Sequence, residues 1–510
     1  MTSLHTPALP RDAREDLGDG LVMRWSTHAD ADNVSALIGD AFKWITITGP
    51  LPPGVAPEPK NELFMHGVKR LLSGKNAAMS DRDYALVEDT RCEPDQNPIV
   101  ACMAIHRLRA YYGSSDIIIG KPEMVATNPN YRNRGFIRKL MFNMIHPESE
   151  ARGDDMQILP GIPYFYRQFG YEYAMANFMA SKVESIQSIP ALEDGKSEPY
   201  ALRKATVEDI PYLIRMSTRE RVSPYTQVGI YYGPEYWKYT VDDIMDIPNP
   251  MQYGVRDTQI IIDAATGEDV GYSIVSTPFG MKVEAIVLDE SVFINDALYP
   301  VLRQLIALEK KRLEAKKTLL QEAEAAKINT TSFPMLLQMH PKHPATALLG
   351  SKMVPLATGP GFRLYSRIDD YPRFILKVRK ELEKRLAESP MAGVTGRLRL
   401  NFYRKVEGNK AKGLEVFLEE GQVVDAKEWV HPGGDKLIEE HLAWKAEGKV
   451  PQVFNAAFAP LTFHQLLLGD RSLEELIWSY GETNIADETV KLLLNSLFPK
   501  GTQHIDTFHW

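Results

Sequence analysis

Apolar and polar residues alternate, or apolar residues run together, in several short segments of the first 130 residues. These segments are LVMRWST (21–27), YALVED (84–89), PIVACMAIHRLRAYYG (98–113) and SDIIIGKPEMVAT (115–127), and each pattern is typical of a β-strand. By contrast, DADNVSALIGDAF (30–42) opens with an aspartate and repeats apolar residues at helical spacing. Strands that alternate with helices predict an α/β unit.

The same pattern starts again after about residue 190. The segment YALRKATVEDIPYLI (200–214) repeats the features of residues 21–38: an apolar strand that carries an arginine (Arg203, Arg24), an acidic helix start and apolar helical spacing. VGYSIVSTPFGMKVEAIVLDE (270–290) likewise resembles the paired strands that end near residue 127. These two matches predict a duplicated domain. Chance similarity between two α/β units remains the alternative.

The pattern of apolar and polar residues changes again near Tyr371. ILKVRKELEKRL predicts a helix, GRLRLNFYRK and KGLEVFLEEGQVVDAKEW alternate as antiparallel strands, and two further helices follow. This pattern predicts a separate α+β domain. We therefore expect three domains, at residues 1–190, 191–370 and 371–510, with residues 1–20 as a tail and residues 190–197 as a linker.

Length and composition narrow the possible classes of protein. The 510 residues suffice for roughly three domains, and no segment approaches the ~18 consecutive apolar residues of a membrane span. The net charge of −8 gives no overall attraction to nucleic acid or anionic lipid. The N-terminus lacks the pattern of a secretory signal, and two cysteines are too few for a disulfide framework. We expect a cytoplasmic protein with neither a nucleic-acid nor a membrane partner.

A cluster of arginines lies between the strand that ends in MVAT and the amphipathic helix that begins at Phe136. Arg132, Arg134 and Gly135 form the loop at the start of this helix, and Arg138 follows in its first turn. Unpaired backbone N–H groups and the helix dipole attract anions there, and glycine allows close approach, so the loop is suited to a pyrophosphate. Arginines that merely open a surface helix are the alternative. Neither a Walker loop nor a GxGxxG turn is present.

The segment VATNPNYRNRGFIRKLM resembles motif A of the GNAT superfamily of N-acetyltransferases, which reads [Q/R]-x-x-G-x-[G/A] between a strand and a helix. The register is Arg132-Asn133-Arg134-Gly135-Phe136-Ile137. It departs from the motif at Ile137, as does the branch typified by the mycobacterial enhanced intracellular survival (Eis) protein. A second segment, YFYRQFGYEYA, resembles the family's Y-x-x-x-G-[FY] element, with Tyr166, Gly170 and Tyr171 in register.

This resemblance implies a fold for the whole chain. Members of that branch have a GNAT acetyltransferase domain, a degenerate second one and a C-terminal domain that resembles sterol carrier protein. The implied fold class is therefore mixed α+β, with tandem GNAT-like domains followed by a sterol-carrier-protein-like domain. The second repeat lacks R-x-x-G after VEAIVLDE and should not bind coenzyme A. The branch also forms hexamers, so a homo-oligomer is implied by resemblance only.

The resemblance also implies roles for individual residues. Acetyl-CoA would be the co-substrate, its pantetheine arm paired with the strand and its pyrophosphate held by the loop, and no metal is expected. The coenzyme-binding residues would be Val125, Ala126, Thr127, Arg132, Asn133, Arg134, Gly135, Phe136, Ile137 and Arg138. Tyr166 would be the general acid that protonates the leaving thiolate. Tyr164, two residues earlier on the same side of a predicted strand, is the competing candidate.

In the same branch the base is the α-carboxylate of the last residue, which here is Trp510. The chain ends in an apolar and aromatic sequence, which fits a buried terminus. A tail packed on its own domain is the alternative, and His509 could also serve as the base. The implied function is direct transfer of acetyl from acetyl-CoA to a primary amine of a small molecule or a lysine-type acceptor. The other readings are a lipid- or ligand-binding protein and a transferase of longer acyl groups.

Overall fold

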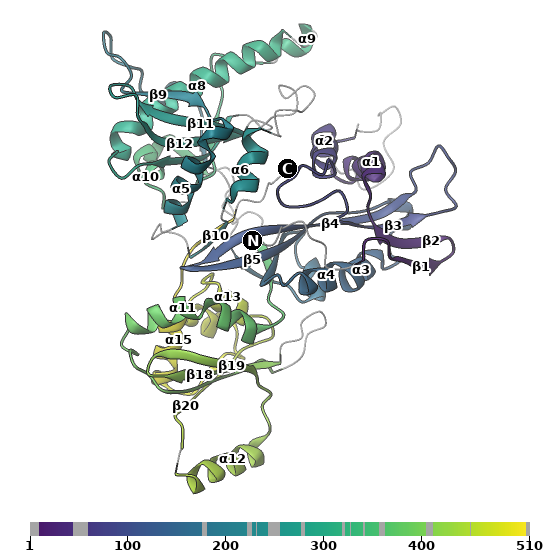
Figure 1. The fold of residues 1–510 in the computed structure, drawn as a ribbon, viewed down its shortest axis with the longest axis vertical. Helices are drawn as coiled ribbons and strands as arrows, with labels where there is room; N and C mark the ends of the chain where they lie inside the picture. The colour runs from purple at the N-terminus through teal and green to yellow at the C-terminus, as the bar shows by residue number, and fades with distance from the viewer. Residues whose placement is uncertain are drawn as a thin grey trace.

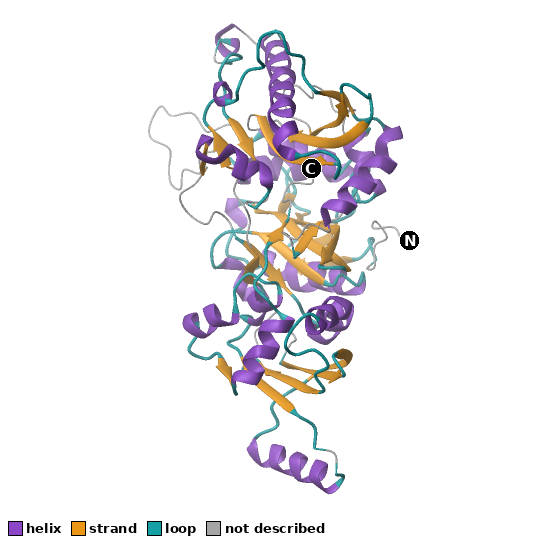
Figure 2. Ribbon diagram, turned by 90° about the vertical axis from the view of Figure 1, so that its left-hand side faces the viewer, coloured by secondary structure: helices purple, strands orange, loops and turns teal. Residues whose placement is uncertain are grey.

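In the computed structural model the chain forms three sheets that follow one another along the long axis of the molecule (Figures 1 and 2). The sheet that contains the N-terminal strands lies in the middle of the molecule. The second sheet along the chain lies at one end and the third at the other (Figure 1). The structure describes residues 10–43, 60–175, 181–221, 227–230, 232–242, 256–276, 281–318, 322–326, 328–339, 342–355, 363–403, 412–448 and 450–505.

The middle sheet carries the predicted site. Its strands follow the order β1 (Arg14–Gly18), β2 (Leu21–Trp25), β3 (Tyr84–Asp89), β4 (Ile99–Tyr112), β5 (Ser115–Thr127), β6 (Met156–Pro160), β16 (Leu364–Arg367) and β7 (Glu172–Met175). Neighbours from β1 to β5 are antiparallel, and β5 and β6 are parallel. The strands predicted from the sequence between residues 21 and 127 are confirmed.

Helices cover both faces of this sheet. The helices α1 (Ala31–Ala41) and α2 (Glu62–Leu71) lie on one face, and a continuous helix made of α3 (Phe136–Leu140), a π-helical turn (Met141–Ile145) and α4 (His146–Ala151) lies on the other (Figure 1). Alternate residues of β4 serve the two faces: Cys102 packs with α1 and α2, whereas Met103 packs with α3. This is the period of two expected for a strand buried on both sides.

The second sheet repeats the first. Its order is β15 (Met353–Pro355), β8 (Ser181–Val183), β14 (Met335–Leu337), β13 (Met281–Leu288), β12 (Asp269–Ser276), β11 (Arg256–Asp263) and β9 (Tyr200–Lys204). Its helices are α5 (Ile210–Arg221), α6 (Pro234–Val241), α8 (Ile294–Lys317), α9 (Glu322–Ala325) and α10 (Pro344–Leu349). Strands β9, β11, β12, β13 and β14 follow the order and directions of β2 to β6, including one parallel pair at the end.

Matching side chains confirm that the two units are repeats. Thr27 and Asp30 form a capping box before α1, and Thr206 and Asp209 form the same box before α5. The strand arginine predicted from the sequence then pairs with the capping aspartate in both units, Arg24 with Asp30 and Arg203 with Asp209, at 2.7 Å. The tandem α/β architecture expected from the sequence is therefore confirmed.

The third sheet belongs to residues after Tyr371. Its order is β19 (Gln422–Glu428), β18 (Gly413–Glu419), β17 (Gly396–Asn401), β20 (Val453–Ala457) and β21 (Asn484–Ile485). Its helices are α11 (Tyr371–Ala387), α12 (Gly434–Ala446), α13 (Phe463–Leu467), α14 (Leu473–Ser479) and α15 (Glu488–Leu497). Leu398 and Leu400 of β17 share one core with Phe374 of α11 and Leu493 of α15. Resemblance of this unit to sterol carrier protein stays a prediction.

Three short strands join the middle sheet from distant parts of the sequence. β16 lies between β6 and β7, β10 (Val228–Ile230) pairs with the end of β4, and β22 (Gln503–His504) pairs with β10. The domain boundaries expected near residues 190 and 370 stay predictions, because these strands and β8 mix the segments. No helix in the described residues is both long and apolar enough to cross a membrane.

The expectation of an N-terminal tail is wrong for residues 11–18. Arg11 is buried, lies over the Trp25 ring, and pairs with Asp83 at 2.6 Å and Glu148 at 2.8 Å. Strand β1 follows and pairs with β2. A polar sequence does not reveal this, because the burial of Arg11 depends on two carboxylates far away in the chain.

Candidate active site

Strands β5 and β6 separate within the middle sheet. They pair only at Ile119 with Met156 and at Gly120 with Gln157. Beyond this point β6 pairs with β16 on its other side, whereas β5 runs on to Thr127 with β4 along one edge. In the described residues the other edge of β5, from Lys121 to Thr127, therefore has no strand partner. Its backbone groups can pair with an extended chain that contains amides.

A β-bulge lies in this unpaired part of β5. Cys102 faces Ala126 and Ala104 faces Glu123, so β5 has one residue more than β4 over this stretch. Met124, at a backbone φ of 53°, adopts the left-handed conformation there. Such bulges redirect the residues next to them and are common beside functional sites. Of the predicted pantetheine contacts, Val125 and Thr127 are half-buried and Ala126 is buried. Nothing in the sequence indicated the bulge.

The predicted pyrophosphate loop follows directly. Arg132, Asn133, Arg134 and Gly135 are all exposed, and Asn133 and Gly135 have φ values of 63° and 76°. Gly135 is the N-cap of α3, and open space surrounds the position where a Cβ atom would stand. Its left-handed backbone explains the glycine. Phe136 is buried, and Ile137 and Arg138 are half-buried, so the helix start is anchored while the loop faces outward.

Two of the arginines rest on aromatic rings beside the loop. The guanidinium carbon of Arg134 lies 4.9 Å from the centre of the Tyr131 ring, and that of Arg138 lies 5.0 Å from the Phe142 ring. The Tyr131 hydroxyl in turn donates a hydrogen bond of 2.9 Å to Asp89 Oδ2. The aromatic contacts limit where the guanidinium groups can go. Together with exposed Arg132 they give the loop a positive charge that complements a pyrophosphate.

Tyr166 lies across the separated strands from this loop. It belongs to a 3-10 helix, Phe165–Phe169, and is only 6% exposed, among the rings of Phe165, Phe169, Tyr171 and Tyr365. It shares one apolar cluster with Phe136 and Leu140, the first turns of the loop's helix. Burial raises the pKa of Tyr166 above its usual value, so the phenol keeps its proton at neutral pH. Within the described residues its hydroxyl has no hydrogen-bond partner.

The expectation that Tyr164 lies on the same side of a strand as Tyr166 is wrong. Tyr164 is 75% exposed, has a φ of 67°, and precedes the 3-10 helix that carries Tyr166. Strand β7 begins only at Glu172. Arg167 lies over the Tyr164 ring at 4.3 Å and pairs with Glu172, which holds the turn together. The apolar run of YFYRQF reflects a compact turn packed on a helix rather than a strand.

The chain end returns to the middle sheet. The backbone N–H of Gln227 donates to Thr502 O at 2.6 Å, and β22 runs parallel to β10, hence antiparallel to β4. Ile505 is buried in the main apolar cluster. The candidate bases Trp510 and His509 lie outside the described residues.

The second repeat offers an internal comparison for the loop. Asn128 and Asp289 each accept a hydrogen bond from the backbone N–H two residues on, at 3.0 and 3.1 Å. The helix then begins at Phe136 in the first repeat but already at Ile294 in the second. The shorter connection leaves out the arginine-rich loop.

His343 lies near the edge of the second repeat that corresponds to the unpaired edge of β5. Burial lowers the pKa of its ring, and the backbone of Ile286, which corresponds to Val125, opposes this effect.

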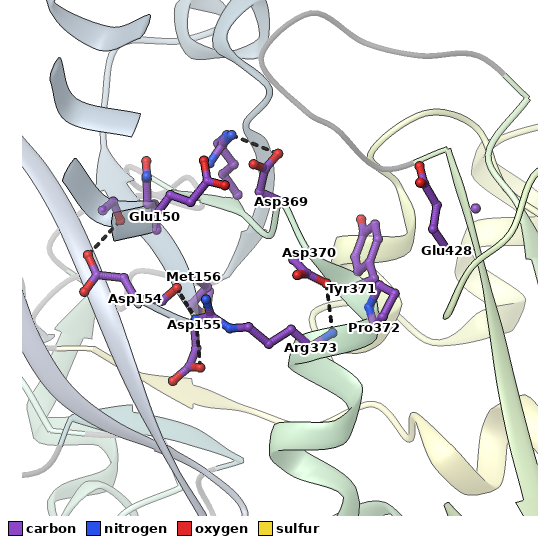
Figure 3. A pocket seen from close by; sticks show the side chains of 14 residues that line it. Glu150, Asp154, Asp155, Met156, Asp369, Asp370, Tyr371, Pro372, Arg373 and Glu428 are labelled. Atoms are coloured by element: carbon purple, nitrogen blue, oxygen red, sulfur yellow. Dashed lines mark hydrogen bonds and ion pairs between the residues drawn. The ribbon is translucent and has the colours of Figure 1, made fainter. Parts of the chain in front are cut away.

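A separate cavity of about 310 Å³ lies between the middle sheet and the third unit (Figure 3). Its walls carry several carboxylates, including Asp154, Asp155 and Asp369, and Arg373 reaches across toward Asp155 (Figure 3). None of the predicted coenzyme-binding or catalytic residues lines this cavity. No group of three or more His, Cys, Asp or Glu side chains in the described residues is placed to hold a metal ion.

Residues 56–174, which contain the separated strands, the loop and Tyr166, match the family model for the acetyltransferase (GNAT) domain. The chain contains a GNAT acetyltransferase domain. Domains of this family use acetyl-CoA or another acyl-CoA, and the protein is accordingly an acyltransferase. A comparison with curated protein sequences finds no match.

The whole chain resembles solved structures of the same architecture. A GCN5-related N-acetyltransferase from Kribbella flavida is 15% identical with a TM-score of 0.58, over 96% of this chain and 98% of that one. A probable N-acyltransferase from Enterococcus faecalis is also 15% identical, with a TM-score of 0.55 and coverage of 96% and 99%. Eis1 from Mycobacterium abscessus is 13% identical, with a TM-score of 0.50 and coverage of 96% and 100%. At this identity the similarity shows the fold.

Proposed function

We propose that this protein transfers the acetyl group of acetyl-CoA directly to a primary amine. The observation that carries the proposal is the meeting of three features at one end of β5: the unpaired edge, the bulge at Met124 and the arginine loop. An extended pantetheine arm needs the first, and an acyl-CoA pyrophosphate needs the last. The names of the similar structures, which include N-acetyltransferases, favour an amine acceptor.

The coenzyme would lie along the unpaired edge. Val125, Ala126 and Thr127 offer backbone groups to the amides of pantetheine, and the loop from Arg132 to Arg138 surrounds the pyrophosphate. The exposed, positively charged loop and the open space at Gly135 fit this ligand. The absence of both features from the second repeat limits binding to one coenzyme per chain.

In the reaction, the neutral amine attacks the thioester carbon, and the carbon–sulfur bond breaks as the amide forms. The leaving thiolate must gain a proton, and we assign this role to Tyr166. Its location beside the helix start supports the assignment, and burial keeps the phenol protonated at neutral pH. Solvent then restores the phenolic proton. No covalent enzyme intermediate is needed.

The base in this proposal is the terminal carboxylate of Trp510. Gly229 of β10 faces His504 on one side and Tyr111 on the other, so β22 runs toward the part of β4 that faces the bulge. The direction in which β22 runs therefore supports the assignment.

We propose domains at residues 1–190, 191–370 and 371–510, with the last resembling sterol carrier protein, and a homo-oligomer in a reducing, cytoplasmic compartment. Cys92 and Cys102 are both free thiols, which fits that compartment. A ligand-binding role of the third unit and transfer of a longer acyl group remain the alternatives.

The test is release of free thiol from acetyl-CoA by the full chain, with nothing appended after Trp510, across aminoglycosides, polyamines, lysine peptides and small aromatic amines. Amine-dependent release is the expected result. Substitution of palmitoyl-CoA for acetyl-CoA tests the longer-acyl alternative. Acetyl-CoA binding without release in any arm would contradict transfer to these amine classes.

A further inference from the structure

A buried polar cluster lies on the α1 and α2 face of the middle sheet, where the unpaired edge of β5 begins. His106 of β4 faces Lys121 of β5, the first residue beyond the last β5–β6 pair. Glu123 follows two residues on, just before the bulge at Met124. Because directly opposed residues of a strand pair share a face, His106, Lys121 and Glu123 point to the same side. The cluster thus sits where the unpaired edge begins.

The carboxylate of Glu123 lies between the other two side chains. His106 Nε2 lies 2.9 Å from Glu123 Oε1, and Lys121 Nζ lies 2.5 Å from Glu123 Oε2. His106 and Lys121 are fully buried and Glu123 nearly so. Burial alone raises the pKa of Glu123, but His106 and Lys121 outweigh it and hold that pKa well below its usual range. Glu123 is therefore a carboxylate that lies close enough to stabilise a charged imidazole.

The other ring nitrogen of His106 is available for chemistry. In the described parts of the chain, both ring nitrogens of His106 and Oε1 of Glu123 are buried without a hydrogen-bond partner, and the same holds for the hydroxyl of Tyr84. Tyr84 faces Ala104 across the strand pair, next to Glu123. Buried polar atoms without partners mark places where a water molecule or a ligand completes the network. The unpartnered atoms of His106 and Tyr84 adjoin the start of the unpaired edge of β5, along which the coenzyme is proposed to lie.

The second repeat shows which part of the cluster the fold itself requires. Lys282 and Glu284 occupy the positions of Lys121 and Glu123, and they pair at 2.8 Å. Ser276 faces Lys282, as His106 faces Lys121, and its hydroxyl donates to Glu284 Oε1 at 2.6 Å. A serine thus satisfies this glutamate in the repeat that lacks the loop. The lysine and glutamate are common to both repeats, whereas the histidine belongs to the repeat with the site.

We propose that His106, with Glu123 beside it, accepts the first proton that the acceptor loses, from its ammonium form. The inference rests on the proposed acetyl transfer and adds a side-chain base to the terminal carboxylate. An ammonium group gives one proton to His106 Nδ1 through a bridging water, and Glu123 stabilises the imidazolium that forms. The neutral amine then attacks the thioester carbon; as the carbon–sulfur bond breaks, Tyr166 protonates the thiolate and the carboxylate of Trp510 takes the second proton from the amide nitrogen. Solvent takes the protons from His106 and Trp510 and restores that of Tyr166.

The test is the substitution His106→Ser, which introduces the residue that the second repeat already uses against its glutamate. We expect kcat to fall about 10²- to 10⁴-fold while KM for acetyl-CoA stays within about twofold.

Ser276→Ala is the matched control, because it changes the corresponding position of the second repeat and should leave kcat unchanged. His106→Gln, which retains a hydrogen-bonding side chain, covers failure of the serine variant to fold. Unchanged kcat in a folded His106 variant would overturn the proposal. Removal of Trp510 then separates the two bases: strong loss in that variant alone assigns the chain end. Activity of the parent chain, measured alongside, tests the acetyl transfer independently.

Discussion

Tyr365 packs edge-on against Tyr166, with ring centres 5.5 Å apart. Tyr365 belongs to β16, which enters the middle sheet between β6 and β7 from the segment after the second repeat. Its ring also stacks on Tyr173 at 3.9 Å, and its hydroxyl donates to Ile162 O at 3.0 Å. The position of the proposed acid therefore depends on a strand that is distant in sequence.

Replacement of Tyr365 by alanine should impair both stability and turnover. Removal of a buried aromatic ring costs about 3–5 kcal/mol of unfolding free energy. A displaced Tyr166 should lower kcat by ~10²-fold. Denaturant unfolding and steady-state kinetics measure the two effects. Tyr365→Phe keeps the ring and should lose only about 1 kcal/mol. Full turnover in the folded alanine variant would show that β16 does not position the acid.

Tyr166→Phe should reduce kcat about 10²- to 10⁴-fold and leave the affinity for acetyl-CoA nearly unchanged, because only the proton donor is removed. Tyr164→Phe is the control, since that ring is exposed and outside the cluster. Thiol release and coenzyme titration give both quantities. Equal turnover in the Tyr166 variant and the parent would remove this hydroxyl from the mechanism.

Arg134→Ala should weaken acetyl-CoA binding by about 10- to 100-fold, as expected for loss of one charge-assisted contact to a phosphate. The measurement is the Kd by calorimetry at low and at raised ionic strength, since salt should weaken the parent more than the variant. Arg379→Ala removes the same charge from an exposed position of α11. If both variants bind like the parent, the loop does not hold the pyrophosphate.

Titration with coenzyme A should give one site per chain. The second repeat has a shortened connection before Ile294, which leaves out the arginine-rich loop. A folded variant with Arg132 and Arg134 both replaced by alanine should therefore lose most of the binding rather than half of it. A stoichiometry of two would mean that the second repeat also binds coenzyme.

Glu284 should stabilise the second repeat in a pH-dependent way. Burial raises its pKa, but Arg256 and Lys282 outweigh burial and lower it from 4.5 to about 2. The stabilisation is thus complete above about pH 4.5 and is lost as pH falls through about 2. Glu284→Gln should cost about 3–5 kcal/mol of unfolding free energy at pH 7, and the difference from the parent should shrink in acid. Glu482→Gln, at an exposed position, is the control. If the difference in unfolding free energy between the Glu284 variant and the parent did not change with pH, the stabilisation would not come from the charge of Glu284.

The local patterns of the sequence predicted much of this structure. The strands from Leu21 to Thr127, the helix after Asp30 and the loop before Phe136 follow from alternation, capping and turn residues, all of which act over a few positions. Arg24 and Arg203 indicated the repeat because each pairs with an aspartate six residues later. Local signals of this kind can be detected in a single sequence.

Other features depend on contacts between distant segments. Nothing in LYSR indicates that β16 inserts beside Tyr166, or that Gln503 and His504 extend the middle sheet through β10. The bulge at Met124 and the cluster of His106 with Glu123 could not be predicted from the sequence either, because the polar residues of the cluster lie in an otherwise apolar strand pair. Tertiary packing, rather than local preference, decides such placements.

The most direct test of the central claim follows the acetyl group itself. The full chain would be incubated with acetyl-CoA deuterated in its acetyl group and with a primary amine that supports thiol release, and the products analysed by mass spectrometry. We predict that the deuterated acetyl group appears as an amide of the acceptor, in equal amount to the free thiol of coenzyme A. Thiol release without the labelled amide would contradict the account.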